Sequence, residues 1–382
     1  MPKNMSLKKF IKNLFFTRSF FNRRIHEGVQ SITDIYSSIA EKQTNYCLKE
    51  LGMSRIPNID DLAGQVVSKC VIGDEKPTKV SQAIDVSVVT VCFNPLEAGR
   101  KELFLKNLDS VQAQEGILLE HLIIDGHSTD GTIEWLMEYQ NEKYDIRILS
   151  KSDSGIYEAM NRGIALAKGK YIIFLNSDDY FHDNYGMNVS FSRIEKLQCE
   201  FSFAPICFSD SSIRHHPQLA PQKRLHHFLI SWPASHQSML TKRSSLISLD
   251  GFDTTYRSAA DYDLLLRMII SGAKGCYVPL AFSTFTLGGF SCYPENSTLI
   301  REECARSLQD FYRKFYSVNM SQIEVEKIFS NRVYPRKYKD IYVKSQRLIK
   351  ERFIGIPQGP INWASQCFNF IKYYLKCIKS RE

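Results

Sequence analysis

The chain has 382 residues, of which 43% are hydrophobic and 24% are charged, and its 49 Lys and Arg against 41 Asp and Glu give a formal net charge of +8. This composition predicts a globular protein large enough to bury a core, and it excludes a largely disordered, collagen-like or low-complexity chain. There is no run of about 18 apolar residues, so the sequence predicts no transmembrane helix.

Both ends of the chain are basic and amphipathic. Apolar residues recur at helical spacing from Leu7 to Phe15, with lysines off the apolar stripe. A similar pattern lies near the C-terminus, where residues 331–382 carry 12 basic and 3 acidic side chains. A basic helix with an aromatic apolar face suits an anionic membrane surface, although docking on the protein's own core or on a partner enzyme would also explain it. We expect peripheral contact with the inner face of the cell membrane.

The cysteines and the N-terminus indicate the compartment. None of the ten cysteines forms a C-x-x-C pair or a zinc-finger spacing with His. The N-terminus has no long apolar core followed by a small-residue cleavage site, so we expect no secretory signal. Reduced thiols in a cytoplasmic protein are the simplest interpretation.

The middle of the chain alternates strands and helices. Residues 85–330 carry 24 basic and 30 acidic side chains, which argues against a nucleic-acid enzyme, so we expect no nucleic-acid partner. Near-continuous apolar and β-branched runs predict strands buried on both faces, and helical stripes lie between them. This βαβαβαβ order predicts an α/β fold whose mostly parallel central sheet has helices on both faces. The strands are expected at 86–92, 119–124, 145–149 and 171–175, and the helices at 103–111, 130–136 and 156–167.

Polar side chains follow all four strands. Asn94 comes after the first, Asp125 ends the second, Asp153 follows the third, and Asp178 and Asp179 follow the fourth. Ligands of parallel sheets bind at the carboxyl ends of the strands, so these side chains are expected to share one site. Adjacent aspartates there can hold Mg²⁺ or Mn²⁺ against a substrate diphosphate and so stabilise it as a leaving group. In isolation, Ser-Asp-Asp would be only a polar turn.

Two common nucleotide-binding motifs are absent. Neither G-x-G-x-x-G nor G-x-x-x-x-G-K-[ST] follows the first strand. The sequence therefore predicts neither a Rossmann dinucleotide-binding fold nor a P-loop NTPase.

Several runs together resemble a known family. VSVVTVCFN, IIDGHSTDGT and SDSGIYEAMNRGIALAKGKYIIFLNSDDYF, followed by HQSML and LDGFDTTYRSAADYDLLLRMI, resemble in order and spacing a family 2 glycosyltransferase with the GT-A fold. The similarity is to bacterial enzymes of the colanic-acid or O-antigen type, and it covers about residues 85–290. It implies a GT-A catalytic domain at 85–290 between a basic helical N-terminal extension at 1–84 and a basic helical C-terminal extension at 291–382.

The resemblance also implies a role for each matching position. It implies donor and nucleotide contacts, which are Thr90, Asn94, Asp125, Asp153, Asn161, Arg162 and Asp178. A divalent metal would lie on Asp179, with Asp178 beside it, and the acceptor would lie near His236 and Gln237.

Asp261 is the catalytic base that the resemblance implies, and Ala260 stands where the family usually has an acidic residue. Taken alone, Asp261 would equally be an acidic residue that opens a helix. As a base it would remove the proton of an acceptor hydroxyl that attacks the anomeric carbon opposite the leaving diphosphate, which inverts the configuration.

The expected function is thus an inverting, metal-dependent transferase. It would move a sugar from a nucleotide donor, taken to be UDP-linked, to a hydroxyl of a lipid-linked glycan in surface polysaccharide biosynthesis. The missing Q-x-x-R-W motif of processive synthases favours single additions. Two alternatives stay open. One is a nucleotidyltransferase on a related fold, and the other is a non-catalytic, membrane-associated nucleotide-sugar-binding or scaffold protein.

Overall fold

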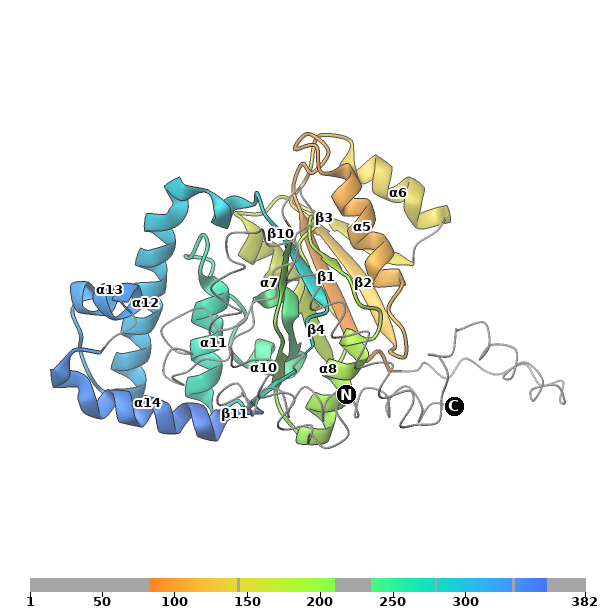
Figure 1. Cartoon of the computed structure of the whole chain (residues 1–382). Helices are drawn as coiled ribbons and strands as arrows, with labels where there is room; N and C mark the ends of the chain where they lie inside the picture. The colour runs from red at the N-terminus through yellow and green to blue at the C-terminus, as the bar shows by residue number, and fades with distance from the viewer. Residues whose placement is uncertain (1–82, 143–144, 210–234, 279, 332–333, 356–382) are drawn as a thin grey trace, which may run out of the picture. The chain divides into compact units, whose positions relative to one another are not determined.

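The computed structural model describes residues 83–142, 145–209, 235–278, 280–331 and 334–355 (Figure 1). The amphipathic patterns predicted near both ends of the chain lie outside these residues. Contacts within the chain divide it into two compact units, Met1–Val80 and Ser81–Glu382, and all described residues belong to the second. In this described part, no helix is both long and apolar enough to span a membrane.

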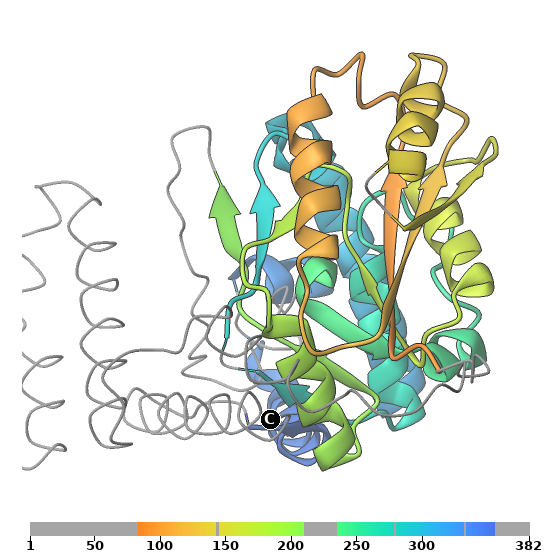
Figure 2. The same ribbon diagram turned by 90° about the vertical axis from the view of Figure 1, so that its right-hand side faces the viewer.

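A mixed, mostly parallel sheet of eight strands is the central element, in the order β11-β9-β6-β8-β4-β1-β2-β3 (Figures 1 and 2). Among the described strands of this sheet, β8 alone runs antiparallel to its neighbours, β4 and β6. The four strands predicted from the sequence are adjacent and parallel, as expected. The strands are β1 (Val86–Cys92), β2 (Leu119–Asp125), β3 (Ile146–Ser150), β4 (Tyr171–Phe174), β6 (Phe201–Phe203), β8 (Met239–Lys242), β9 (Gly275–Tyr277) and β11 (Phe353–Ile354).

Helices cover both faces of this sheet, and Figures 1 and 2 show α5 and α7 on opposite faces. The mostly parallel, helix-covered sheet confirms the predicted α/β class. The helices are α5 (Lys101–Gln112), α6 (Thr132–Glu142), α7 (Ile156–Leu166), α8 (Gly186–Leu197), α10 (Arg243–Ser248), α11 (Ala260–Ser271), α12 (Ser297–Tyr316), α13 (Gln322–Asn331) and α14 (Lys339–Arg352).

The side chains of β1 explain the two-sided packing. All seven residues of the strand are buried, as its β-branched run predicts. Because side chains alternate along a strand, Val89 and Val91 join one core cluster with α7 and α11, and Val88 joins another with α8. Gly163 lets α7 approach closely, since a Cβ there would lie 2.4 Å from a methyl of Val89.

The helices that follow residue 290 share the core of the sheet. Leu308, Phe311 and Tyr312 of α12 are buried in the same cluster as Val89. Figure 1 shows α12 alongside α11, with α13 and α14 beyond it. The predicted helical C-terminal segment is therefore packed on the sheet domain as far as it is described, and the boundary at 290 stays a prediction.

A small second sheet extends the edge where β4 ends. Its order is β5-β10-β7, with β10 antiparallel to β5 and parallel to β7. A short 3-10 helix, η2 (His236–Ser238), leads directly into β8. The strands are β5 (Tyr180–Phe181), β7 (Cys207–Ser209) and β10 (Ser283–Thr286).

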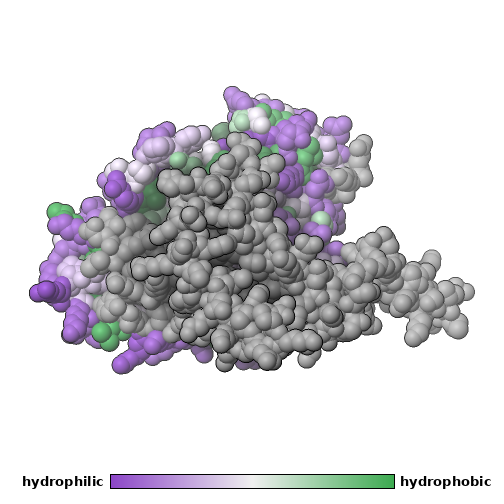
Figure 3. Space-filling view, viewed as in Figure 1, coloured by the Kyte–Doolittle hydropathy of each residue, from purple (hydrophilic) through white to green (hydrophobic). Residues whose placement is uncertain are grey.

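The described surface is largely polar on the face seen in Figure 3, with scattered hydrophobic patches around the grey atoms.

The described cysteines are free thiols.

Candidate active site

The loops after β1 and β2 are tied together at the carboxyl edge of the sheet. Asn94 has a left-handed backbone, with φ at 44°. Its side-chain oxygen accepts a hydrogen bond from the Thr129 N–H at 2.9 Å, and its own N–H donates to the Ser128 hydroxyl at 2.8 Å. Asn94 therefore fixes the loop after β1 to the loop after β2. Its predicted contact with a donor stays a prediction.

Asp125 organises the end of β2 from inside the protein. It is fully buried, and one carboxylate oxygen accepts hydrogen bonds from the backbone of His127 and Ser128 at 3.0 and 2.9 Å and from the Ser150 hydroxyl at 2.7 Å. The other oxygen accepts from the Ser128 hydroxyl at 2.5 Å. This carboxylate joins β2 to β3 and fixes the loop that follows β2, and its predicted contact with the nucleotide stays a prediction.

A second carboxylate lies beside an exposed aromatic ring. A Cβ at Gly126 would lie 3.0 Å from the Asp153 carboxylate and 3.3 Å from the Phe93 ring, so the three residues meet at one point. Phe93 is 66% exposed, and partial burial raises the pKa of Asp153. An exposed aromatic face next to hydrogen-bonding groups is suited to stacking on a flat base. Sequence reasoning missed Phe93, although an aromatic residue directly after a buried strand was a visible signal.

Thr90 lies inside the sheet rather than on the surface of the site. Its side chain is fully buried, and its hydroxyl is 2.9 Å from Nε2 of His121. Burial lowers the pKa of His121 to about 3, so the imidazole is neutral. Thr90 thus supports β1 and β2 from within.

Asn161 and Arg162 are both engaged with the chain itself. The Asn161 amide donates to the Phe252 carbonyl and accepts from the Phe252 N–H, each at 2.8 Å. Arg162 donates to the carbonyls of Lys151 and Ser152 at 2.7 and 2.6 Å. These contacts hold α7 against its surroundings, and a role toward the donor stays a prediction for both residues.

The two adjacent aspartates after β4 diverge. Asp179 is buried, and its two carboxylate oxygens accept from the Gln237 amide at 2.7 Å and the Thr286 N–H at 2.8 Å. Burial and the neighbouring Asp178 raise the pKa of Asp179 well above its usual range. Asp178 keeps 11% of its side chain exposed and pairs with Arg100. Gln237, predicted near the acceptor, is fully buried beneath Asp179.

Arg100 connects three segments around Asp178. It precedes the first turn of α5, and its guanidinium donates to the Asp178 carboxylate and, at 2.8 Å, to the Gly288 carbonyl. Burial raises the pKa of Asp178, and Arg100 opposes that rise. Sequence reasoning missed Arg100, because nothing in its local pattern pointed to a partner 78 positions away.

Asp261 faces an imidazole. Nδ1 of His236 lies 3.2 Å from Oδ2 of Asp261, and the Tyr262 N–H donates to Oδ1 at 3.0 Å. Burial raises the pKa of Asp261, and the hydrogen bond from His236 counteracts part of that rise. The residue after His236, Gln237, donates to Asp179, which adjoins Asp178, so this short segment links the two acidic positions. The structure therefore brings the predicted base and the predicted metal-binding aspartate to one site.

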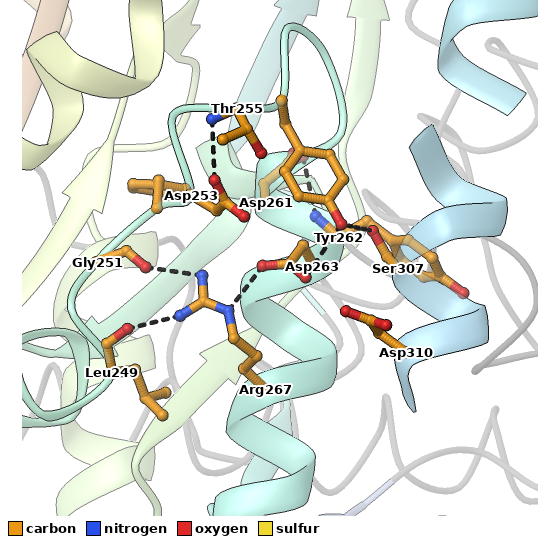
Figure 4. Close-up of polar contacts among 12 residues, drawn as sticks. Leu249, Gly251, Asp253, Thr255, Asp261, Tyr262, Asp263, Arg267, Ser307 and Asp310 are labelled. Atoms are coloured by element: carbon orange, nitrogen blue, oxygen red, sulfur yellow. Dashed lines mark hydrogen bonds and ion pairs between the residues drawn. The ribbon is translucent and has the colours of Figure 1, made fainter. Parts of the chain in front are cut away.

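The neighbouring Asp263 has a structural role instead (Figure 4). Its carboxylate accepts from Nε of Arg267 at 2.7 Å, and the same guanidinium donates to the carbonyls of Leu249 and Gly251 at 2.6 and 2.8 Å. The two acidic residues in the first turn of α11 thus have different partners. Asp263 fastens the preceding loop, and Asp261 faces His236.

Comparison with known families gives the arrangement a context. The family described as glycosyl transferase family 2 matches residues 87–230. The matched residues carry the sequence features of a family 2 glycosyltransferase domain. Together with the mostly parallel sheet, this match confirms the predicted GT-A fold class.

Relatives of the glycosyltransferase domain include enzymes of very different length. The chain is 30% identical over 163 residues to a chondroitin synthase of Pasteurella multocida, covering 42% of this chain and 17% of that protein. It is 26% identical over 162 residues to a PGL/p-HBAD biosynthesis glycosyltransferase of Mycobacterium bovis, covering 42% of this chain and 62% of the relative. The chain thus spans less than two thirds of the length of either.

Solved structures are more distantly similar. S. aureus TarS 1-349 in complex with UDP-GlcNAc aligns with a TM-score of 0.48 at 14% identity, covering 78% of this chain and 93% of that one. The mannosyltransferase PcManGT from Pyrobaculum calidifontis, in complex with GDP-Man and Mn²⁺, aligns with a TM-score of 0.48 at 14% identity, covering 80% and 83%.

The glycosyltransferase domain offers too few side chains to hold a metal alone. Among the described residues, no group of three or more His, Cys, Asp or Glu side chains is arranged for a metal ion. Nε2 of His236 is buried and has no hydrogen-bond partner in this part of the chain. Together with Asp178, it would give one nitrogen and one oxygen ligand, a set that suits Mn²⁺ better than Mg²⁺, with phosphate oxygens completing the coordination.

Proposed function

We propose that this protein is an inverting glycosyltransferase that moves a sugar from a nucleotide-sugar donor to an acceptor hydroxyl. One observation supports it most directly: His236 lies 3.2 Å from Asp261, and the next residue, Gln237, donates to Asp179 beside Asp178, in a chain that matches family 2. A base and a group that binds a diphosphate are the two parts that such a transfer needs.

The donor is proposed to lie along the carboxyl edge of the sheet. The base would stack on the exposed Phe93 ring and meet Asp153, which lies beside Gly126 next to the same ring. The diphosphate would extend toward Asp178 at the end of β4. Arg100 is close enough to this carboxylate to meet the phosphates as well.

Asp178 and His236 are the residues proposed to hold the divalent metal, in preference to Asp179. Both oxygens of Asp179 already accept hydrogen bonds in the core, whereas Asp178 keeps an accessible edge. A bound Mg²⁺ or Mn²⁺ supplies positive charge that stabilises the departing diphosphate.

Asp261 is proposed to accept the proton of the acceptor hydroxyl. The Tyr262 N–H holds Oδ1, and His236 fixes the direction of Oδ2, so the carboxylate meets the hydroxyl in one orientation. Burial raises the pKa of Asp261, which makes it a stronger base than an exposed aspartate. Attack on the face opposite the diphosphate inverts the anomeric centre.

The acceptor is proposed to be a lipid-linked glycan of a bacterial surface polysaccharide, and the donor a UDP-sugar. The relatives named for chondroitin synthesis and PGL/p-HBAD biosynthesis support a glycan or glycolipid product. The basic segments 1–84 and 331–382 would supply contact with anionic lipid.

A donor screen with matched variants tests this function. The full-length protein is tested for thermal stabilisation and donor hydrolysis with UDP-, GDP-, dTDP- and CMP-sugars, with and without Mn²⁺. Asp261→Asn should keep donor binding and lose turnover by about 100-fold or more. Asp250→Asn, at an exposed left-handed position that Asn tolerates, is the control and should behave as wild type. Binding without any turnover in wild type would favour the binding or scaffold alternative.

A further inference from the structure

The helix that carries Asp261 is capped from another part of the chain. At its own N-cap, Ala259, no side chain caps α11. Instead, the Glu303 carboxylate of α12 accepts hydrogen bonds from the backbone N–H groups of Arg257, Ser258 and Ala259, at 2.7, 2.9 and 3.0 Å. Glu303 is buried, with 7% of its surface exposed. Three consecutive amides before the helix therefore converge on one buried carboxylate.

The residues that follow Glu303 hold the same loop. The Arg306 guanidinium lies 3.6 Å from the centre of the Tyr256 ring and donates to the Thr255 hydroxyl at 3.1 Å. The Ser307 hydroxyl is 3.0 Å from the Tyr256 hydroxyl. Figure 4 shows this loop and the first turn of α11 facing α12. Side chains of α12 thus contact residues 255–259, the segment that leads into α11.

We propose that Glu303 is a positioning residue for Asp261, an inference that rests on the proposed function. These three amides belong to the residues just before α11. The buried carboxylate satisfies donors that would otherwise be unpaired, and it lies at the positive end of the helix dipole. Asp261 lies in the turn that these amides open, and its contact with His236 depends on the path of that turn. A displacement of about 1 Å at a reacting group can cost about 100-fold in rate.

The alternative is that Glu303 only attaches the C-terminal helices to the core. That role predicts a loss of thermal stability without a change in chemistry. Positioning predicts a loss of kcat while the donor, which lies against β1, β2 and β4, still binds.

The test compares Glu303→Ala and Glu303→Gln with Glu302→Gln in the full-length protein. Glu302 is the exposed neighbour on α12 and serves as the matched control. Glu303→Ala should lower kcat by about 10- to 100-fold with a donor Kd within about twofold of wild type. Glu303→Gln keeps one acceptor oxygen and should lie between, and Glu302→Gln should match wild type.

Hydrogen exchange of the amides at 257–259 separates the two parts of the proposal. Exchange should rise in Glu303→Ala, and unchanged exchange would overturn the capping. Increased exchange with wild-type kcat would overturn the positioning role. If Glu303→Ala does not fold, Glu303→Gln decides by the same criteria. A wild type that turns over no donor would overturn the proposed function, and the positioning role with it, while the exchange result still decides the capping.

Discussion

His236 and Asp261 are 25 positions apart in the chain, yet Nδ1 of the imidazole lies 3.2 Å from Oδ2 of the carboxylate. The other ring nitrogen is buried and has no hydrogen-bond partner among the described residues. The adjacent Gln237 donates to Asp179, the neighbour of Asp178 at the end of β4. The pair His236-Gln237 therefore connects the proposed base with the proposed diphosphate side of the site.

Replacing His236 by Ala should move the acid limb of the kcat profile to higher pH. Asp261 is active when deprotonated, so activity falls as the pH drops through its pKa. Burial raises that pKa and His236 lowers it, hence loss of the imidazole raises it further. His236→Asn, whose amide can still donate from the Nδ1 position, should shift the limb less. An unchanged limb in His236→Ala would contradict the assignment of Asp261 as the base.

Replacing Arg100 by Ala should tighten the binding of Mn²⁺ in the absence of nucleotide. The guanidinium occupies the Asp178 carboxylate, so a cation must compete with it. Since Arg100 is about one third exposed, the effect should be modest, an about 3- to 10-fold lower Kd by calorimetry. Lys101→Ala removes the adjacent exposed cation and should leave the Kd unchanged. Weaker Mn²⁺ binding in Arg100→Ala would show that Arg100 supports the metal site instead.

The strands and their polar ends could be predicted because each depends on a local pattern. The run 86–92 is buried throughout, and Asp125 and Asp178 lie at the strand ends where a parallel sheet places them. Thr90 could not be placed, because its partner His121 is set by the register of two strands. Pairings across long stretches of chain, such as that of Arg100, leave no local signal at all.

The buried His121 should make stability depend on pH. Its pKa is lowered to about 3 in the folded protein, against about 6.5 in the unfolded chain. The stability from its neutral form is therefore complete above about pH 6.5 and is lost as the pH falls toward the folded value. Between pH 7.5 and 5, this one group should cost about 2 kcal/mol of unfolding free energy. His121→Gln should remove that part of the slope in urea titrations.

The control for this slope is His127→Asn, which changes an exposed imidazole at a left-handed position that Asn tolerates. It should keep the wild-type pH dependence. Equal slopes for wild type and His121→Gln would mean that folding does not lower the pKa of His121.

Replacing Phe93 by Ala should weaken the binding of nucleoside diphosphates by about tenfold, or about 1.4 kcal/mol. The ring is 66% exposed beside Gly126 and Asp153, and stacking of a base on an aromatic side chain contributes about 1–3 kcal/mol. Phe93→Tyr should keep the affinity. Leu118→Ala removes an exposed apolar side chain at the opposite end of β2 and is the control. Equal affinities for Phe93→Ala and wild type would place the base elsewhere.

Replacing Asn161 by Ala decides between a structural and a donor-binding role for this residue. Both amide atoms are bonded to the backbone of Phe252 at 2.8 Å, so the variant should lose about 2 kcal/mol of unfolding free energy. Its donor Kd should stay within about twofold of wild type. Asn161→Asp keeps the acceptor for the Phe252 N–H but loses the donor, and should fall between. A tenfold weaker donor affinity with unchanged stability would instead support the donor contact that the family resemblance implies. Loss of the two hydrogen bonds to Phe252 would lower the stability, so a change in affinity alone must come from a contact with the donor.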